Sequence, residues 1–331
     1  MSNELLRIEN LDVAFKTRSG MVNAINSVSY EVRAGEVLGI VGESGCGKSV
    51  SMNAVMRLLP DNAVIRGGTI SYKGKNIFDY TEKEMQQIRG NEMTMIFQDP
   101  MSSLDPLYTV GNQMVETLCR HKKMNKKDAA ALAVDYLGKV GIHEPERCFR
   151  QYPFELSGGM RQRIVIATAL CCDPDLMIAD EPTTALDVTI QAQILDLMTK
   201  LHREQNNAIV FITHNMGIVS GLCDRILVMY AGRIVERGTV DDIFYRTAHP
   251  YTEGLLRCIP RLDGERKTHL HPIEGSVVNP KHLPKGCHFA GRCEHCMNIC
   301  QKAAPPEFEI APGHTSACWL RALDGLEVAK A

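Results

Sequence analysis

Four short apolar runs divide the first two thirds of the chain, and each is followed by glycine or polar residues. They cover residues 36–41, 93–98, 176–179 and 208–214. Runs of this length with such boundaries are typical of buried strands. Because stretches of helical pattern separate them, the runs favour a parallel sheet, in which the carboxyl ends of the strands share one edge.

Other stretches predict helices and a hairpin. Apolar positions recur at helical spacing over 49–59 and over 186–204, and the chain up to about residue 160 also has a helical pattern. Residues 225–238 instead predict two strands joined by a turn at Ala231 and Gly232. The whole pattern indicates an α/β protein.

The first apolar run leads into the most specific motif. Residues 42–49 read GESGCGKS, which matches the phosphate-loop pattern G-x4-G-K-[ST] between a strand and a helix. Its glycines let backbone N–H groups surround phosphate oxygens, and the helix start adds its positive dipole end. Lys48 is expected to reach the β and γ phosphates of a nucleotide and Ser49 to bind Mg²⁺. The predicted binding residues are Gly42, Ser44, Gly45, Cys46, Gly47, Lys48, Ser49 and Val50.

Polar side chains end the other three runs. Asp180 and Glu181 follow one strand, and we expect Asp180 to hold Mg²⁺ through water and Glu181 to polarise an attacking water. Gln98 ends another strand, where its amide can reach Mg²⁺ or that water. His214 ends the last, where it can hydrogen-bond the γ phosphate and sense its loss.

A second glycine-containing helix start lies far from the first. Residues 153–163 read PFELSGGMRQR, in which Ser157, Gly158 and Gly159 open an apolar, helix-like run. Hydroxyl and amide donors at a helix start suit a phosphate, and glycines allow close approach. The sequence therefore carries two phosphate-binding patterns in one chain.

Composition and charge exclude several classes of protein. The net charge of −2 argues against a dedicated nucleic-acid binder. No apolar run approaches the roughly 18 residues of a membrane helix, and the N-terminus MSNELLRIEN does not have the pattern of a signal peptide. We therefore expect a cytoplasmic protein with reduced thiols.

The chain has 12 cysteines, and five lie between residues 287 and 318. Four thiolates in a reduced compartment suggest a closed tetrahedral metal site, with which zinc and an iron–sulfur cluster are both compatible. Spacing favours neither, and free thiols are a third interpretation. The candidates are Cys287, Cys293, Cys300 and Cys318, with Cys296 as an additional cysteine inside the set.

Taken together, these motifs resemble the ATP-binding subunits of ABC transporters. Residues 42–49 resemble Walker A, Gln98 the Q-loop and LSGGM the signature motif. Asp180 and Glu181 resemble Walker B with its catalytic glutamate. The residues ALD, which end at Asp187, resemble the D-loop, and His214 resembles the switch histidine. All six occur in family order between residues 5 and 240.

The resemblance explains why there are two phosphate-binding patterns. In this family two ATPase domains pair head to tail, so Ser157, Gly158 and Gly159 would bind the partner's ATP. Met160 stands where many members carry glutamine, after the three residues that contact phosphate. Phe15 occupies the place of the aromatic residue that stacks on adenine, although a core phenylalanine on an alternating strand is the alternative.

The resemblance also implies the architecture. It predicts a P-loop NTPase fold of ABC type in residues 1–244, with an antiparallel β subdomain and a helical signature subdomain at about 100–165. A small cysteine-rich extension follows in residues 245–331. No internal repeat or low-complexity linker is evident.

Residues beyond the motifs narrow the resemblance to bacterial dipeptide and oligopeptide importers. They include FQDPMSSLDPLYTVG, AHPYTEGLL (248–256) and GCHFAGRCEHCMNIC. Some ATPases that match this tail carry a [4Fe–4S] cluster, so the resemblance favours that cluster over zinc, on Cys287, Cys293, Cys300 and Cys318. The cluster is expected to be structural.

The family role is an energy-coupling ATPase with ATP and Mg²⁺ as ligands. The implied partners are a related second ATPase subunit, two transmembrane permease subunits and a periplasmic peptide-binding protein, with no nucleic acid. The implied location is the cytoplasmic face of the bacterial inner membrane, as a peripheral subunit. Import of nickel or another small solute is an alternative, and a soluble ABC ATPase outside transport is another.

Overall fold

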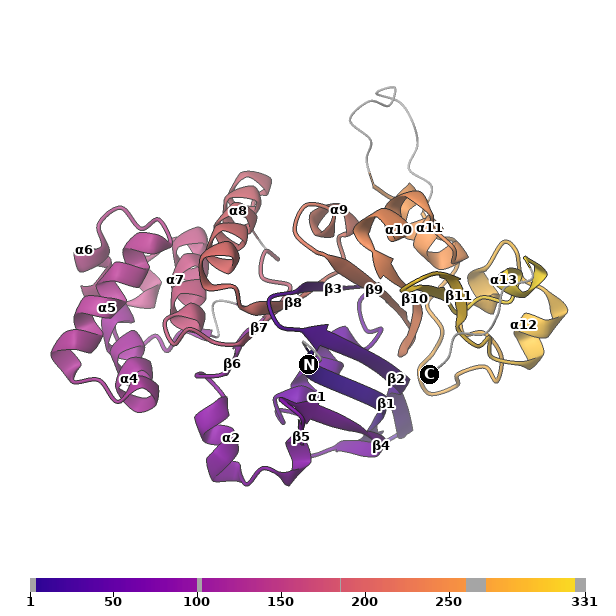
Figure 1. The fold of residues 1–331 in the computed structure, drawn as a ribbon, viewed down its shortest axis with the longest axis horizontal. Helices are drawn as coiled ribbons and strands as arrows, with labels where there is room; N and C mark the ends of the chain where they lie inside the picture. The colour runs from indigo at the N-terminus through magenta and orange to yellow at the C-terminus, as the bar shows by residue number, and fades with distance from the viewer. Residues whose placement is uncertain (1–3, 100–102, 185, 260–271, 325–331) are drawn as a thin grey trace. The chain divides into compact units, whose positions relative to one another are not determined.

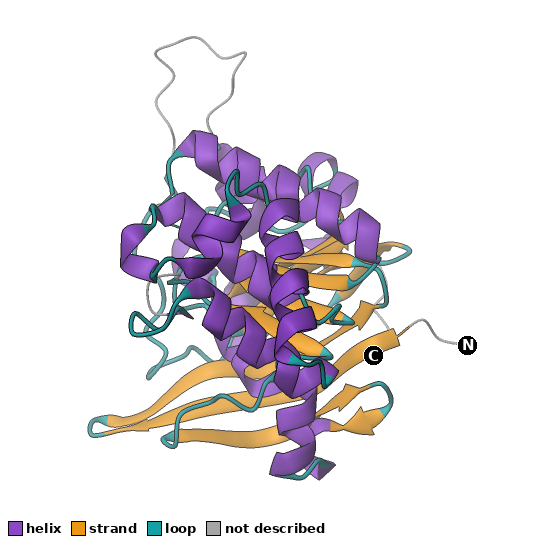
Figure 2. Ribbon diagram, turned by 90° about the vertical axis from the view of Figure 1, so that its left-hand side faces the viewer, coloured by secondary structure: helices purple, strands orange, loops and turns teal. Residues whose placement is uncertain are grey.

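The structure is a computed structural model that describes residues 4–99, 103–184, 186–259 and 272–324 of the 331-residue chain (Figure 1). The described residues form both helices and strands, which are purple and orange in Figure 2. The chain forms two compact units. The first comprises Met1–Glu4, Val32–Glu36 and Phe78–Ile212, and the second comprises Leu5–Glu31, Val37–Ile77 and Thr213–Ala331.

Three of the predicted strands lie side by side in the first unit. They are β6 (Met93–Ile96), β7 (Leu176–Asp180) and β8 (Ala208–Thr213), which pair in parallel in the order β8–β7–β6. Every residue of β7 and β8 is buried. The continuous apolar runs therefore mark strands covered on both faces, as the sequence pattern predicts.

The helices of the first unit are mostly capped by polar side chains. A cluster of four, magenta in Figure 1, consists of α4 (Val110–Lys122), α5 (Lys126–Lys139), α6 (Pro145–Arg150) and α7 (Gly158–Leu170). Thr109, Asn125 and Ser157 each accept a hydrogen bond from the first turn of the helix they precede. The unit also contains α2 (Glu82–Ile88), α8 (Val188–Gln205) and two short 3₁₀ turns, Ile77–Asp79 and Pro153–Glu155.

The N-terminal half of the second unit forms an antiparallel sheet with the strand order β2–β1–β4–β5. Its strands are β1 (Glu4–Thr17), β2 (Gly20–Arg33), β4 (Ala63–Tyr72) and β5 (Lys75–Asn76). Leu6 pairs with Tyr72 and Phe15 with Ala63, with irregular register around Asp12. The predicted antiparallel start of the chain is therefore present.

A second group of strands in this unit has the order β11–β12–β10–β9–β3. Here β3 (Val37–Val41) runs parallel to β9 (Arg225–Tyr230), and β10 (Arg233–Thr239) returns antiparallel to β9. The turn between β9 and β10 is Ala231–Gly232, with φ of +46° and +79°. Two successive positive φ values match the right-handed twist of a hairpin, so the predicted hairpin is confirmed.

The C-terminal extension continues this second group of strands. Strand β12 (His314–Ser316) pairs with β10, and β11 (Phe308–Ala311) pairs with β12. The remaining elements of the unit are α1 (Lys48–Val55), α9 (Met216–Val219), α10 (Val240–Tyr245), α11 (Pro250–Arg257), the 3₁₀ turn Ala290–Arg292, α12 (Asn298–Lys302) and α13 (Leu320–Leu323). The extension therefore covers what would otherwise be an unpaired edge of β10.

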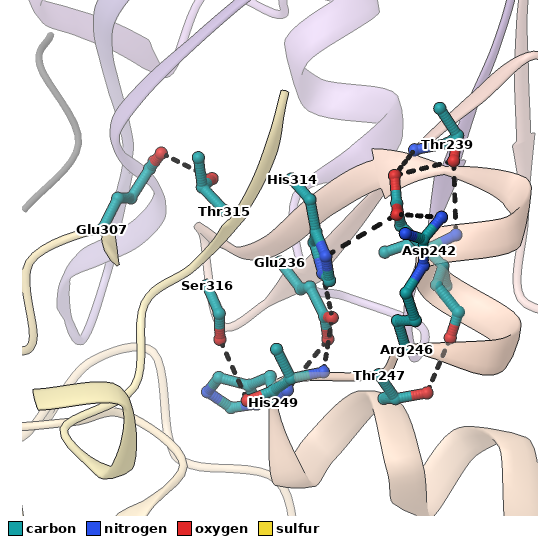
Figure 3. A network of polar contacts seen from close by, with 12 residues as sticks. Glu236, Thr239, Asp242, Arg246, Thr247, His249, Glu307, His314, Thr315 and Ser316 are labelled. Atoms are coloured by element: carbon teal, nitrogen blue, oxygen red, sulfur yellow. Dashed lines mark hydrogen bonds and ion pairs between the residues drawn. The ribbon is translucent and has the colours of Figure 1, made fainter. Parts of the chain in front are cut away.

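A buried polar network joins the extension to β10 (Figure 3). The Glu236 carboxylate accepts backbone hydrogen bonds from Ala248 (2.7 Å) and His249 (3.0 Å), and its Oε1 lies 2.9 Å from Nε2 of His314. The side chains of Glu236 and His314 are completely buried. Because an unpaired buried carboxylate would be very costly, these partners specify the position of β12 against β10.

Asp242 extends the network at the start of α10. Its carboxylate accepts hydrogen bonds from the backbone and hydroxyl of Thr239, and its Oδ1 lies 3.9 Å from Nδ1 of His314. Burial alone would raise the pKa of Asp242, but the bonds from Thr239 and the nearby His314 and Arg246 hold that pKa below its usual value.

His249 makes the stability of this region depend on pH. Burial lowers the pKa of His249 from 6.5 to about 3, and the positive charge of Arg321 adds to this effect while the backbone of Ala317 opposes it. Between these values the unfolded chain binds the proton and the folded chain does not. Stability should therefore fall as the pH falls from 6.5, by up to about 1.4 kcal/mol per pH unit from this group.

This dependence can be tested with His249→Asn, whose side-chain oxygen retains an acceptor for the Tyr251 amide. Urea unfolding of both proteins at several pH values between 7.5 and 4.5 should give a shallower loss of unfolding free energy for the variant. Equal pH slopes for the two proteins would show that His249 does not titrate as described.

Candidate functional site

The phosphate-loop sequence lies between β3 and α1 in the second unit. All five residues of β3 are buried, so the strand anchors the start of the loop. Helix α1 begins at Lys48 with Gly47 as its N-cap, and no side chain caps it. The helix start thus has the form that binds an anion with backbone groups and the helix dipole.

Two glycines are required by the backbone of this loop. Gly42 has φ +152°, and a Cβ atom there would lie 2.2 Å from the carbonyl oxygen of Met229. Gly47 has φ +104°, and its Cβ would lie 2.5 Å from the carbonyl oxygen of Ala24. No other residue fits either position without moving the backbone, so both ends of the loop are held by close packing.

Lys48 lies inside the loop and is only 5% exposed. Its ammonium group donates hydrogen bonds to the carbonyl oxygens of Gly42 (2.7 Å) and Glu43 (3.1 Å). Ser44 and Gly45 are exposed at the tip, while Ser49 and Val50 are half-buried in the first turn of α1. The loop therefore presents a positive charge and backbone amides in one place, as phosphate binding needs.

The acidic pair lies at the end of β7 in the first unit. Asp180 is 6% exposed and Glu181 is 9% exposed. The amide of Gln98 donates to Oε2 of Glu181 at 3.1 Å, and the hydroxyl of Thr184 donates to the same oxygen at 2.9 Å. The structure thus brings together Gln98 and Glu181, which the sequence analysis placed at the ends of two strands.

The backbone of Glu181 is strained as well as anchored. Its φ is +47°, a conformation that costs a residue other than glycine about 1–3 kcal/mol. The Glu181 N–H donates to the carbonyl oxygen of Ile212 at 2.9 Å, which holds the residue in place. Strain of this kind is typical of residues whose side chain must point in one direction for function.

Two predicted binding residues of the first unit also cap helices. The hydroxyl of Ser157 accepts the Met160 amide (3.3 Å) at the start of α7, and Asp187 accepts the Ile190 amide (2.9 Å) at the start of α8. Ser157 and Gly158 are exposed, and Gly159 is half-buried beside Ile190. The second glycine-containing stretch is therefore an exposed helix start.

Phe15 and His214 belong to the second unit. Phe15 is half-buried in β1, and His214 is exposed directly after β8. The loop residues and these two are thus in one unit, while Gln98, Asp180, Glu181, Asp187 and the Ser157 stretch are in the other. Their assembly around one nucleotide stays a prediction.

Three contacts of these motifs were not identified by the sequence analysis. They are the bond of Thr184 to Glu181 and the bonds of Tyr251 and Arg292 to Glu43, a residue within the phosphate loop. Tyr251 and Arg292 do lie in the two C-terminal stretches that the sequence analysis quoted, AHPYTEGLL and GCHFAGRCEHCMNIC. That signal marked the right segments but carried no information on what they contact.

The four candidate cysteine ligands all lie in the second unit but do not form a ready metal site. Burial, with a smaller contribution from neighbouring thiols of the set, raises the pKa of Cys287, Cys293 and Cys318 to about 11. In residues 4–99, 103–184, 186–259 and 272–324, no three His, Cys, Asp or Glu side chains are arranged to hold a metal ion. The arrangement of the described side chains therefore supports neither zinc nor the cluster.

None of the helices in the described ranges is long and apolar enough to cross a membrane.

Comparison with known proteins identifies two families along the chain. The model of the ABC transporter family matches residues 25–184. The model of the oligopeptide/dipeptide transporter C-terminal region matches residues 235–300.

Individual relatives match over almost the whole length. The dipeptide transport ATP-binding protein DppD of Bacillus subtilis (strain 168) is 49% identical over 319 residues, which cover 96% of this chain and 95% of the relative. The oligopeptide transport ATP-binding protein OppD of Escherichia coli (strain K12) is 49% identical over 318 residues, which cover 96% of this chain and 94% of that relative.

Solved structures share the fold. The dimeric post-hydrolysis state of the ATP-binding cassette MJ0796, bound to ADP and Pi, aligns with a TM-score of 0.64 at 26% identity over 71% of this chain and 99% of that one. The cbiO1 structure from Clostridium perfringens, part of the ABC transporter complex cbiONQ, aligns with a TM-score of 0.62 at 26% identity. The alignment covers 74% of this chain and 93% of cbiO1.

The chain therefore belongs to the ATP-binding proteins of ABC transporters. Within that class it belongs to the group that carries the oligopeptide/dipeptide transporter C-terminal region. The predicted fold class and family are confirmed, and so is the predicted type of enzyme, an ATPase coupled to transport.

The loop geometry makes a prediction about thiol reactivity. Cys46 is 1% exposed, and burial raises the pKa of its thiol although Lys48 opposes this effect, whereas Cys296 is exposed. Because the thiolate is the reactive form, N-ethylmaleimide should modify Cys296 well before Cys46. Peptide mapping by mass spectrometry after timed labelling measures both rates, with Cys46→Ser to confirm the assignment. Faster labelling of Cys46 would contradict the closed loop geometry.

Proposed function

We propose that this chain binds MgATP through residues 42–50 and hydrolyses it to power the import of dipeptides and oligopeptides. The observation that carries the ATPase assignment is the orientation of the Glu181 carboxylate by Gln98 and Thr184. The peptide substrate is supported by the names of the relatives, which are dipeptide and oligopeptide transport proteins.

Each nucleotide-binding residue has a proposed role. Lys48 contacts the β and γ phosphates, and Phe15 stacks on adenine. Ser49 and Gln98 would hold Mg²⁺, with Asp180 acting through water, and the bound ion would neutralise phosphate charge. The amides of the loop, Gly42, Ser44, Gly45, Cys46, Gly47 and Val50, surround the phosphates.

Hydrolysis is assigned to residues at the strand ends. Glu181 accepts a proton from the attacking water, and its two neutral donors hold the carboxylate in position without supplying a competing charge. His214 contacts the γ phosphate. In the transporter, Ser157, Gly158 and Gly159 contact the nucleotide of the partner ATPase, and the exposed helix start at Ser157 supports this role. Asp187 is a further proposed nucleotide-binding residue.

We propose that the chain works within a complete ABC importer, in which it pairs head to tail with another ATPase subunit. The partners are a related second ATPase subunit, two transmembrane permeases and a periplasmic peptide-binding protein, and the chain is peripheral on the cytoplasmic face of the inner membrane. We also propose functional domains at residues 1–244 and 245–331. The helices α4–α7 support a helical subdomain at about 100–165.

We also propose that a [4Fe–4S] cluster is bound by four cysteines, Cys287, Cys293, Cys300 and Cys318. Its support is the resemblance of the cysteine spacing to cluster-bearing relatives and the hydrogen bond from the Cys287 N–H to the carbonyl oxygen of Cys300 at 2.7 Å, which places these two cysteines side by side. Binding would require deprotonation of the thiols and a closer approach of the sulfurs. Cys296 is exposed and is left outside the ligand set.

Glu181→Gln should abolish steady-state ATP hydrolysis, a loss of about 100-fold or more, because an amide cannot accept the proton from water. ATP binding should persist, since the loop residues are unchanged. Phosphate release by the assembled transporter and MgATP titration of the purified chain measure the two effects. Thr184→Val, which removes one donor to Glu181, should lower the rate less. Normal turnover in Glu181→Gln would remove Glu181 from its role.

Peptide import is tested by uptake of a labelled dipeptide into cells that lack the gene. Uptake should be lost, recovered with the wild-type gene and not recovered with Lys48→Ala. Unchanged uptake in the deletion strain would contradict the peptide assignment and leave the ATPase assignment standing.

The metal proposal is tested by iron, sulfide and zinc analysis of anaerobically purified protein. We expect about four iron and four sulfide per chain, with loss of both in Cys300→Ser. One equivalent of zinc without iron, or no metal at all, would contradict the cluster.

A further inference from the structure

Glu43 is a non-glycine residue of the phosphate loop, and it carries a negative charge where phosphates are expected to bind. A bare carboxylate at this place would repel a nucleotide. In the structure, an arginine of the C-terminal extension pairs with the Glu43 carboxylate, and a tyrosine of the extension accepts the Glu43 backbone N–H.

We infer that Arg292 and Tyr251 position the phosphate loop for nucleotide binding, with Glu43 as the point of contact. This inference rests on the proposed binding of MgATP by the loop. Arg292 and Tyr251 are positioning residues, because they act through Glu43.

The side-chain contact is a bidentate ion pair. Nη1 and Nη2 of Arg292 lie 2.6 and 3.0 Å from Oε2 and Oε1 of Glu43. The Arg292 side chain is 6% exposed and that of Glu43 is 29% exposed. A two-point contact between guanidinium and carboxylate fixes direction as well as distance, and burial protects it from screening by salt.

Arg292 is itself held from several sides. Its Nε donates to the carbonyl oxygen of Glu274 (3.1 Å) and its Nη2 to that of Ile273 (3.2 Å). The guanidinium also lies over the ring of Tyr230, 5.8 Å from the centroid. These contacts orient the guanidinium independently of Glu43, so the loop is held by a preorganised group.

The backbone contact comes from α11. The Glu43 N–H donates to the hydroxyl of Tyr251 at 2.9 Å. Tyr251 is completely buried, and its ring packs against those of Tyr230 and Phe289 with centroids 4.7 and 5.3 Å apart. A hydroxyl on a fully packed ring has one position, so it determines where this loop amide lies.

The two contacts reach Lys48 through a single residue, Glu43. The carbonyl oxygen of Glu43 accepts a hydrogen bond from Nζ of Lys48 at 3.1 Å. Tyr251 and Arg292 thus fix the residue that orients the loop lysine, and Arg292 compensates the one negative side chain of the loop. Loss of Arg292 would free the loop and expose the nucleotide to an uncompensated carboxylate.

The test is MgATP affinity of the purified full-length chain, measured by isothermal titration calorimetry. Arg292→Gln should weaken binding roughly tenfold, since it removes the charge that compensates Glu43. Adding Glu43→Gln to that variant should restore part of the affinity, because the repulsive charge is then gone while the loop still lacks its side-chain contact. A merely structural role for Arg292 does not predict recovery on removal of its partner.

Arg257→Gln is the matched control. Arg257 also lies in the extension, lines the same cavity as Arg292 and pairs with Glu253, but its side chain is 49% exposed and it does not contact the loop. It should bind MgATP like the wild type. Wild-type affinity in Arg292→Gln would overturn the inference, whereas failure of the wild type and Arg257→Gln to bind would instead overturn the proposed nucleotide site.

Two further variants address folding and catalysis. Tyr251→Phe keeps the packed ring and removes only the acceptor for the Glu43 amide, so it should weaken affinity a few-fold with unchanged thermal stability. In the assembled transporter, Arg292→Gln should raise KM for ATP and leave kcat at saturating ATP near the wild-type value. A fall in kcat with unchanged KM would overturn the assignment as a positioning residue.

Discussion

The close approach of two backbone segments to the phosphate loop constrains the conformation of the candidate nucleotide site. At Gly42 and Gly47 the loop touches the carbonyl oxygens of Met229 and Ala24 so closely that no side chain fits. Strand β9 and strand β2 supply these carbonyls, so the antiparallel sheet and the strand group around β3 both shape the loop. The packing of the unit around these two glycines thus constrains the loop conformation.

The C-terminal extension is part of this same packed unit. It adds β12 to the edge of β10, and the buried network of Glu236, His314 and Asp242 holds the added strand in place. It also holds Glu43 through Tyr251 and Arg292. The residues through which the extension acts on the loop are therefore a tyrosine and an arginine, and not the cysteines on which the predicted metal site rests.

The sequence predicts the local elements and motifs well but not the long-range contacts. Buried strands appear as apolar runs, and the pairing of Gln98 with Glu181 follows from polar residues at parallel strand ends. Helix α1 ends at Val55 although the apolar pattern continues to residue 59, because Arg57 turns with φ +51°. Arg292 and Glu43 are separated by 249 positions, and no periodicity relates residues so far apart. The cysteines have a spacing along the chain that suits a metal site, but in the described residues their side chains are not arranged to hold a metal ion. Spacing in sequence alone does not fix the distances between sulfur atoms in the fold.

The most direct test of the central claim is calorimetric titration of MgATP into the full-length chain and into Gly47→Ala. Saturable one-to-one binding by the wild type is the expected result. The variant should bind about tenfold more weakly or not at all, because a Cβ at 2.5 Å from the Ala24 oxygen must displace the start of α1. Its far-ultraviolet circular dichroism should be unchanged. Equal affinities for the two proteins would contradict a loop whose packed backbone forms the phosphate site.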